Sequence, residues 1–461
     1  MTLPHLAPNL RARIYNIMSK QIDSTRRDFI KTSTATAGAA LAFPSVTFGK
    51  PNSSKLKLGW IGCGGRGSGA INQALSADSN VELHAIGEAF QDKADAGLER
   101  IKKYHPAKIS GEIKKRMFVG IDAYKKVIDS GVDVVLLATP PGFRPQHIKA
   151  AVDAGKHVFA EKPMATDVPG VHSVMKSIEK AKQQGTSIVD GFVWRWTYAQ
   201  RDTYEKILGG ELGDLQAIFS SYNNNARKRY VDWNRENTKT DVEYMLRRWY
   251  YFTWLSGDHI VEQAVHSIDK MLWAKNDEVP AYAIANGGRQ NRGEEEGNIY
   301  DHFGVEFSWA DGTQGYHFCR QMDNCENGVW DRVYGTKGKY TGESGRKLHV
   351  FSNKDGLMWR WNAGPNGERS NNGYQTEHDE MYAAIRDGKP LNTGDRMIKT
   401  TLTAMMARTA AYTGKKVTKE MMLASKEQLV PDQISFDMKF PPRAVRHAGR
   451  DEVLKPHGWE A

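Results

Sequence analysis

The sequence predicts a two-domain α/β protein, in which a doubly wound parallel sheet precedes a second α/β domain built on an open, largely antiparallel sheet. Three observations support this fold class. Continuous apolar runs alternate with amphipathic segments between residues 55 and 190, and aromatic residues crowd residues 194–254. Helical periodicity then returns between residues 377 and 413. With 461 residues, 40% of them hydrophobic and 26% charged, the chain can fill two or three domain cores.

The first domain is expected over residues 51–192. Its apolar runs read LKLGWIG, VELHAIG, DVVLLAT, HVFAE and TSIVDGF. Helix-periodic stretches such as Arg144–Ala154 and Val168–Gln184 separate them. Strands that are apolar throughout, with amphipathic helices between them, are typical of a parallel sheet covered on both faces.

The second domain is expected over residues 193–374. The segment LQAIFSSY has the composition of a strand, and HFGVEFSW and QGYHFCRQ flank the turn Ala310-Asp311-Gly312, which suits a hairpin. Residues 375–417 predict a helical segment that packs back on both domains, and residues 418–461 form a weakly patterned C-terminal tail.

The N-terminal residues 1–42 resemble a twin-arginine export signal. The segment TRRDFIK is followed by the small-residue apolar stretch TSTATAGAALAF, and Ala40-Leu41-Ala42 offers a cleavage site. Met18 is a second candidate start. A cytosolic N-terminal helix is the alternative. The signal predicts a periplasmic or otherwise exported protein.

The charge, hydrophobicity and cysteine content of the chain limit which binding partners, membrane spans and disulfides are expected. The net charge of +10 is spread thinly outside the signal, so no nucleic-acid partner is expected. No stretch reaches the ~18 apolar residues of a membrane span. Three cysteines are too few for a disulfide framework; Cys319 and Cys325 could pair after export, although free thiols are favoured.

Residues 62–67, GCGGRG, match the pattern G-x-G-x-x-G between a predicted strand and a predicted helix over Gly65–Ala77. Glycines there allow a tight turn and close backbone approach to a pyrophosphate at the helix N-terminus. Glu88 ends the second strand, where an acid binds both ribose hydroxyls and repels a 2′-phosphate. The motif therefore predicts NAD, with NADP less favoured; a glycine-rich turn without a ligand is the alternative.

Glu161-Lys162-Pro163 directly follows the strand HVFA. Ligands of open parallel sheets bind beyond the carboxyl ends of the strands, so Lys162 is expected where a substrate meets the cofactor. Its ammonium could hold a substrate hydroxyl and stabilise a developing oxyanion. A solvated lysine at a strand end is the alternative.

One amphipathic helix is predicted from residue 258 to residue 272. Asp258, Glu262, His266 and Asp269 share its polar face, so Glu262 lies one turn from His266. A carboxylate in that position can orient an imidazole and raise its basicity, as a general base for a sugar hydroxyl requires. A helix with a solvated acidic face is the alternative.

These motifs, in this order, resemble the Gfo/Idh/MocA oxidoreductase family, in particular exported members that act on sugars. The similarity extends from about Lys55 to Val417. It implies a Rossmann domain, a second domain on an open sheet, dimers or tetramers formed through that sheet, bound NAD or NADP, and catalytic roles for Lys162 and His266. This chain has Glu262 where the family usually has aspartate, Ala264 where glycine is customary, and Arg144 where many members have histidine.

The predicted site follows from the motifs and the resemblance together. The catalytic residues are Lys162, His266 and Glu262, and no metal is expected. The cofactor-binding residues are Gly62, Cys63, Gly64, Gly65, Arg66, Gly67, Glu88, Thr139, Pro140, Arg144, Glu161, Lys162 and Arg195. The substrate-binding residues are Trp194, Trp196, Trp254, His259, Tyr300 and His302; the tryptophans offer flat apolar faces to the C–H face of a sugar.

We therefore expect hydride transfer between a tightly held nicotinamide cofactor and a carbohydrate hydroxyl or ketone. His266 would take the hydroxyl proton, Glu262 would orient the imidazole, and Lys162 would hold the oxyanion. Export of the folded protein with its cofactor would require each turnover to restore the cofactor in place. Two alternatives stay open: a redox-neutral NAD-dependent glycosidase that oxidises, eliminates and re-reduces, and a non-catalytic sugar-binding protein.

Overall fold

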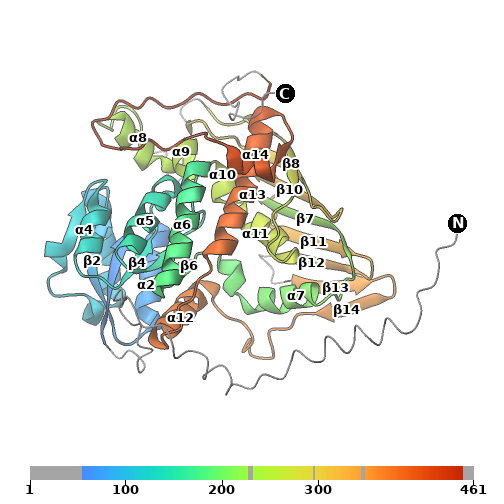
Figure 1. Cartoon of the computed structure of the whole chain (residues 1–461), viewed down its shortest axis with the longest axis horizontal. Helices are drawn as coiled ribbons and strands as arrows, with labels where there is room; N and C mark the ends of the chain where they lie inside the picture. The colour runs from blue at the N-terminus through green and yellow to red at the C-terminus, as the bar shows by residue number, and fades with distance from the viewer. Residues whose placement is uncertain (1–53, 227–231, 294–295, 344–347, 450–461) are drawn as a thin grey trace, which may run out of the picture. The chain divides into compact units, whose positions relative to one another are not determined.

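The computed structural model describes residues 54–226, 232–293, 296–343 and 348–449 (Figure 1). All of them belong to one compact unit, Gly49–Ala461. The predicted export signal at residues 1–42 and the candidate start Met18 lie outside the described residues. Within the described residues, no helix is long and apolar enough to cross a membrane.

The first sheet is parallel throughout and has the order β3-β2-β1-β4-β5-β6, which confirms the doubly wound domain. Its strands are β1 (Leu56–Ile61), β2 (Val81–Glu88), β3 (Met117–Val119), β4 (Val134–Leu137), β5 (His157–Ala160) and β6 (Ile188–Asp190). Its helices are α2 (Gly65–Ala77), α3 (Gln91–Tyr104), α4 (Ala123–Asp129), α5 (Arg144–Asp153) and α6 (Val168–Gln184), with short 3₁₀ turns η1 (Pro106–Lys108), η2 (Ile113–Arg116) and η3 (Pro141–Phe143) between them.

Both faces of this sheet are buried, because alternate strand residues enter different cores. In β4, Val135 and Leu137 join the core formed with α4, α5 and α6, whereas Val134 and Leu136 join the core formed with α2 and α3. Figure 1 shows α4, α5 and α6 along one face. The unbroken apolar strands of the sequence follow from this double coverage.

The second sheet has nine strands in the order β14-β13-β12-β11-β7-β10-β9-β8-β15. Only the β7–β10 pair among them is parallel, so the sheet is largely antiparallel, and β9 and β10 form the predicted hairpin. The strands are β7 (Leu215–Asn224), β8 (Tyr282–Gly288), β9 (His302–Ser308), β10 (Gln314–Gln321), β11 (Trp330–Gly335), β12 (Lys339–Glu343), β13 (Leu348–Asn353), β14 (Gly356–Arg360) and β15 (Val417–Thr418).

Helices connect the two sheets. They are η4 (Val193–Trp196), α7 (Tyr198–Leu208), α8 (Asp241–Arg247), η5 (Trp249–Tyr251), α9 (Thr253–Ser256), α10 (His259–Glu262) and α11 (Val265–Ala274). The predicted helical segment after residue 375 is two helices, α12 (Gly373–Arg386) and α13 (Gly394–Thr413). Helix α12 contacts α2, while α13 contacts α6 of the first domain and β8 of the second.

The tail after residue 418 is more ordered than its sequence pattern predicted. It supplies β15 to the second sheet and the helix α14 (Lys419–Ala424). Beyond α14 it runs past α8 and α9 (Figure 1), and Leu429 enters their apolar core. Ile434, Phe436, Met438 and Phe440, which alternate along the sequence, pack against the same core. That alternation is the sequence signal that the prediction missed.

Candidate active site

A cavity of about 600 Å³ lies beyond the carboxyl ends of β1, β2, β4 and β5. Its opposite wall comes from the α8–η5 segment and the start of α11. It brings together most of the residues predicted from motifs far apart in the sequence. The predicted residues that line it are Gly62, Gly64, Gly65, Arg66, Gly67, Glu88, Thr139, Pro140, Arg144, Glu161, Lys162, Glu262 and His266.

The glycine loop forms a cradle that a dinucleotide would fill. Gly62 has φ +94°, and a Cβ on Gly67 would lie 1.9 Å from the Gly62 carbonyl oxygen, so both positions require glycine. A Cβ on Gly64 or Gly65 would meet nothing within 4 Å. Helix α2 begins there without a side-chain cap, so its first N–H groups are available to a pyrophosphate. The residues present therefore fit a dinucleotide.

Glu88 is held at the end of β2 by backbone donors. Oε2 accepts from Cys63 N at 2.6 Å, and Oε1 accepts from Ala89 N at 2.7 Å. Burial raises the pKa of the Glu88 carboxyl, and these donors oppose the rise. Cys63 itself does not line the cavity; its side chain lies in the core with Trp60, and burial raises the pKa of its thiol. Cys63 therefore acts on the site through its backbone, by fixing the acid that the sequence predicts to bind a ribose.

Lys162 and Glu262 form an ion pair on the cavity wall. Lys162 Nζ donates to the Glu262 carbonyl oxygen and, at 2.8 Å, to Glu262 Oε1. The two side chains are 10% and 12% exposed. Glu262 Oε2 is buried without a hydrogen-bond partner among the described residues. Since both residues line the cavity, a substrate that enters it meets an ammonium already paired with a carboxylate.

This pairing corrects the prediction that Glu262 orients His266. The predicted continuous helix is broken into α10, which ends at Glu262, and α11, which begins at Val265. The helix is interrupted between them, and Glu262 Oε2 and His266 Nδ1 are both without a hydrogen-bond partner among the described residues. The four polar residues of the predicted face are also buried, so the alternative of a solvated acidic face is wrong.

His266 presents a neutral imidazole to the cavity. Burial lowers the pKa of His266 well below its ordinary value, and the cations of Lys162 and Lys270 lower it further. Its Nδ1 has no hydrogen-bond partner among the described residues. The ring centroids of Trp194 and Phe192 lie 5.2 and 5.9 Å from that of His266, so aromatic contacts hold the ring. A neutral, positioned imidazole can accept a proton.

Arg144 fixes the backbone on which Lys162 stands. Its guanidinium donates at 2.5 Å to the carbonyl oxygens of Pro163 and Thr139. Burial lowers the pKa of Arg144 to about 10, while Glu161 and Glu262 oppose that fall. Arg144 therefore joins the carboxyl end of β4 to the loop after β5.

Arg66 links the glycine loop to α12. Its guanidinium donates to Glu161 Oε1 and, at 3.1 Å, to Glu377 Oε1, and it lies 4.4 Å from the Tyr374 ring centroid. Burial raises the pKa of the Glu377 carboxyl well above its ordinary value. Tyr374 lines the cavity, although no local motif marks it. Helix α12 therefore contributes to the site, although no predicted site residue lies on it.

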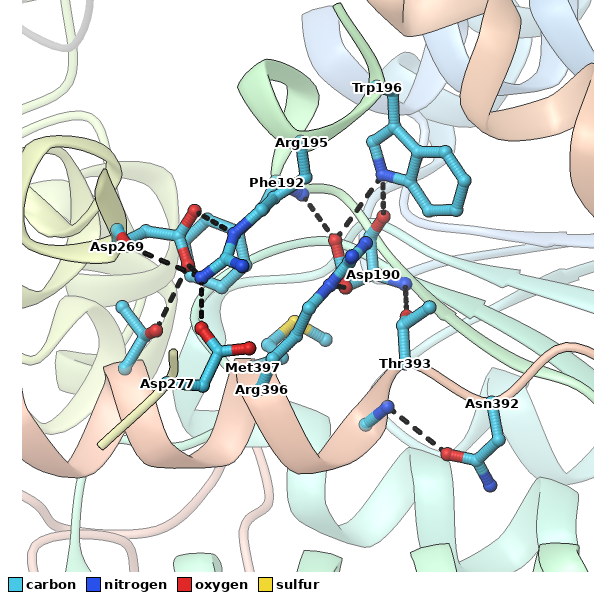
Figure 2. Close-up of polar contacts among 12 residues, drawn as sticks. Asp190, Phe192, Arg195, Trp196, Asp269, Asp277, Asn392, Thr393, Arg396 and Met397 are labelled. Atoms are coloured by element: carbon cyan, nitrogen blue, oxygen red, sulfur yellow. Dashed lines mark hydrogen bonds and ion pairs between the residues drawn. The ribbon is translucent and has the colours of Figure 1, made fainter. Parts of the chain in front are cut away.

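The predicted cofactor residue Arg195 is placed elsewhere, in the buried cluster of Figure 2. Its guanidinium makes two 2.8 Å hydrogen bonds to the Asp269 carboxylate and a 2.5 Å bond to Asp277. Beside it, Arg396 donates to Asp190 at 2.6 Å. Arg195 does not line the cavity, because the ion pairs hold it against α11. The structure thus corrects its role: it anchors the helix that carries His266.

The predicted substrate-binding residues do not line the cavity. Trp196 donates to the Asp190 carbonyl, and Trp254 lies in the core with Phe143. Tyr300 N donates at 2.8 Å to Asp258, whose carboxyl pKa burial raises to about 6.

The two predicted histidine contacts also lie elsewhere. His259 is buried beside Phe303, and His302 contacts Asp301 at 2.7 Å. Trp194 does not line the cavity but contacts His266, with ring centroids 5.2 Å apart. These placements correct the predicted substrate contacts.

Sequence reasoning missed several residues of the cavity wall. From the first domain these are Phe90, Lys93, Ile121, Tyr124, Phe143 and His147; from elsewhere they are Trp233, Leu246, Arg247, Trp249, Tyr250, Gln263 and Tyr374. Trp233, Trp249 and Tyr250 belong to the aromatic stretch that the sequence does reveal. Composition alone could not say which aromatic side chains face a cavity and which fill a core.

The comparisons with known proteins concern the family and the fold. Residues 56–189 match the model of an oxidoreductase family with an NAD-binding Rossmann fold, GFO_IDH_MocA. The chain is 26% identical over 338 residues to 4-carboxy-2-hydroxymuconate-6-semialdehyde dehydrogenase of a Sphingobium species, covering 71% of this chain and 91% of that protein.

A shorter match and a solved structure extend the comparison. A glycosyl hydrolase family 109 protein of Shewanella baltica is 27% identical over 179 residues, which cover 34% of this chain and 38% of that protein. The crystal structure of aldose-aldose oxidoreductase from Caulobacter crescentus, 18% identical, superposes with a TM-score of 0.61 and covers 79% of this chain and 99% of that one. That likeness concerns the fold.

Proposed function

Through the dinucleotide-binding domain at residues 56–189, this chain belongs to the Gfo/Idh/MocA family of oxidoreductases, and from that premise we propose that it oxidises a carbohydrate hydroxyl and reduces the corresponding ketone with bound NAD. One observation carries the proposal: a single cavity joins the glycine cradle and Glu88 to Lys162 and His266. The family match at the cradle supports the cofactor, and the ion-paired lysine with the neutral histidine supports chemistry on a hydroxyl.

The cradle residues and Glu88 would hold the dinucleotide. When bound, its nicotinamide supplies a two-electron acceptor for a hydrogen on the substrate carbon. Glu88, with both oxygens fixed by backbone donors, would accept hydrogen bonds from the ribose hydroxyls and repel a 2′-phosphate, which favours NAD over NADP.

Lys162 and His266 would act at the substrate oxygen. The Lys162 ammonium would donate a hydrogen bond to that oxygen and stabilise negative charge that develops on it. His266 would take the hydroxyl proton, since its neutral form is the one that burial favours. Glu262 would hold the Lys162 ammonium in place through Oε1.

The test begins with the protein as purified. Denatured extracts are analysed by mass spectrometry for bound nucleotide, and turnover is followed with a panel of sugars through the absorbance of reduced nicotinamide. Lys162→Ala and His266→Ala should abolish turnover. Lys275→Ala removes an ammonium that lies outside the cavity and should leave turnover unchanged. A protein without nucleotide, or one indifferent to both active-site substitutions, would contradict the proposal and favour a non-catalytic sugar-binding protein.

A redox-neutral glycosidase is the second candidate, and the match to a glycosyl hydrolase family 109 protein favours it. The same residues would oxidise a ring carbon of the glycoside and allow the leaving group to depart by elimination. Water would then add at the carbon that lost it, and the hydride would return to the oxidised carbon. Incubation with aryl glycosides, without added cofactor, separates the two candidates. Release of a phenol supports the glycosidase, and its absence alongside sugar-dependent reduction of the nucleotide supports the oxidoreductase.

We further propose export and self-association. The motif TRRDFIK supports a periplasmic location, which fractionation of cells that express the full chain would test. The outer face of the second sheet exposes Ile284 (43%) and Phe318 (44%), and Phe219 stacks on Tyr316 there. A homodimer or homotetramer would cover these side chains. Light scattering of wild type and Phe318→Glu tests this, because the charge should favour the monomer.

A further inference from the structure

The end of the cavity farthest from Lys162 is walled by two parts of the chain. Glu88 marks this end as the one for a ribose of the adenosine half, and Phe90 follows it on the same loop. Facing them, Trp233 and Arg247 come from the segment around α8, outside the first domain. A Rossmann domain alone would leave this end open on that side.

Arg247 connects the two walls. Its guanidinium carbon lies 3.9 Å from the ring centroid of Phe90 and 3.8 Å from that of Trp233. It also bonds to Asp92, in the first turn of α3, at 3.2 Å, and to Glu243 of α8 at 3.0 Å. The Arg247 side chain is 11% exposed. One side chain therefore holds together an aromatic stack and two carboxylates across the mouth of the site.

The C-terminal tail supports this arrangement from behind. Phe436 contacts Phe90 with ring centroids 5.7 Å apart, and Phe440 contacts Trp254 at 5.2 Å. The tail is anchored upstream, where the backbone N–H groups of Leu429 and its neighbour donate to Asp167 Oδ2. The loop after β2 is thus pressed between α8 and the tail.

We propose that Arg247, Phe90 and Trp233, supported by the tail at Phe436, form a clamp that retains the adenosine half of the dinucleotide between turnovers. The inference rests on the proposed function, because it takes the cavity to hold a dinucleotide. Release then requires the Arg247 contacts to Phe90 and Asp92 to open. A held cofactor also suits a protein that restores its cofactor in place.

The experiment measures release, not activity. The full chain is loaded with NAD carrying a radiolabel in the adenine, excess unlabelled NAD is added, and retained label is followed after rapid gel filtration. Arg247→Met keeps the aliphatic stem but removes the charge and the planar donor. We expect it to release label roughly tenfold faster than wild type or more, since lost contacts act mainly on the dissociation rate. Phe436→Ala should accelerate release without altering a residue of the cavity wall.

The matched control is Arg235→Met. Arg235 precedes the same helix, pairs with Asp241 at 2.5 Å and lies 4.2 Å from the Tyr244 ring centroid, but it does not line the cavity. It should release label at the wild-type rate. If Arg247→Met and Phe436→Ala both release at the wild-type rate, the clamp is wrong while the dinucleotide site stands. If wild type binds no NAD at all, the proposed function falls and the clamp with it.

Discussion

Lys162 and Glu262, a hundred residues apart in sequence, meet at 2.8 Å on the wall of the cavity. The carboxylate fixes an ammonium that would otherwise be free to turn on four rotatable bonds. The family's customary aspartate is one methylene shorter. In this chain the length of the glutamate side chain therefore determines where its carboxylate meets the Lys162 ammonium. The position of Lys162 is therefore expected to depend on the length of residue 262 as well as on its charge.

Shortening that residue tests the dependence. Glu262→Asp should lower kcat roughly 10²-fold, because a displacement of about 1 Å in a catalytic group has effects of that size. Glu262→Gln keeps the length and one acceptor oxygen and should lose less. Steady-state kinetics with the best sugar substrate provides the measurement. A larger loss in Glu262→Gln than in Glu262→Asp would show that the charge of residue 262, and not its length, is what matters.

The lowered pKa of His266 predicts how the activity depends on pH. Burial and nearby cations lower its pKa well below the ordinary ~6.5, so the ring stays neutral and able to accept a proton as the solution becomes acidic. The acidic limb of the kcat/KM profile should therefore lie well below pH 6.5. His266→Asn should remove turnover at every pH. An acidic limb at about pH 6.5 that persists in an active His266→Asn variant would assign the limb to another group.

Two glycines of one loop should respond differently to alanine. A Cβ at position 67 would meet the Gly62 carbonyl at 1.9 Å, so Gly67→Ala should destabilise the fold by about 1–3 kcal/mol or more. A Cβ at position 64 meets nothing within 4 Å but would enter the cradle. Gly64→Ala should therefore melt like wild type yet bind NAD more weakly. Thermal unfolding and calorimetric titration measure the two effects; normal NAD affinity in Gly64→Ala would argue against the cradle.

Arg195 should matter for stability and not for the cofactor directly. Asp269→Asn leaves the buried Arg195 with a weaker partner, and loss of one member of a buried ion pair typically costs about 3–5 kcal/mol. Urea unfolding should show a loss of this order. At temperatures where the variant is folded, its NAD affinity should match that of wild type. A selective loss of affinity without a loss of stability would restore Arg195 to the cofactor site.

Buried histidines should make the fold sensitive to acid. Burial lowers the pKa of His147 to about 3 and that of His378 well below its ordinary value. Below about pH 6.5 the unfolded chain protonates both rings while the folded chain does not, so the unfolding free energy should fall with pH, by up to ~1.36 kcal/mol per pH unit for each ring.

His378→Phe isolates one of these groups. Both ring nitrogens of His378 are buried without a hydrogen-bond partner among the described residues, and the ring packs 4.3 Å from Phe159. The substitution should raise the unfolding free energy by about 1–3 kcal/mol and make its fall between pH 7 and pH 5 shallower. His172→Phe, at an exposed site, controls for the added ring. A destabilised His378→Phe protein would indicate a partner for this histidine.

Much of the first domain and part of the cavity wall could be predicted from sequence. The signals are local: strands that are apolar on both faces, the segment GCGGRG before a helix, and the strand-end residues Glu88 and Lys162. The position of a residue along a parallel strand also fixes the edge of the sheet at which it lies. Helices α2 and α6 have the predicted bounds.

The tertiary structure decided which side chains meet. Nothing near Glu262 in the sequence shows that its partner is Lys162, since the two residues lie a hundred positions apart and meet only in the folded chain. Periodicity could not show that Arg195 is held by Asp269, or that Arg247 and the tail reach the loop after Glu88. A short motif specifies its own backbone and its place in a sheet, whereas contacts between distant segments depend on how whole helices pack, which no single segment encodes.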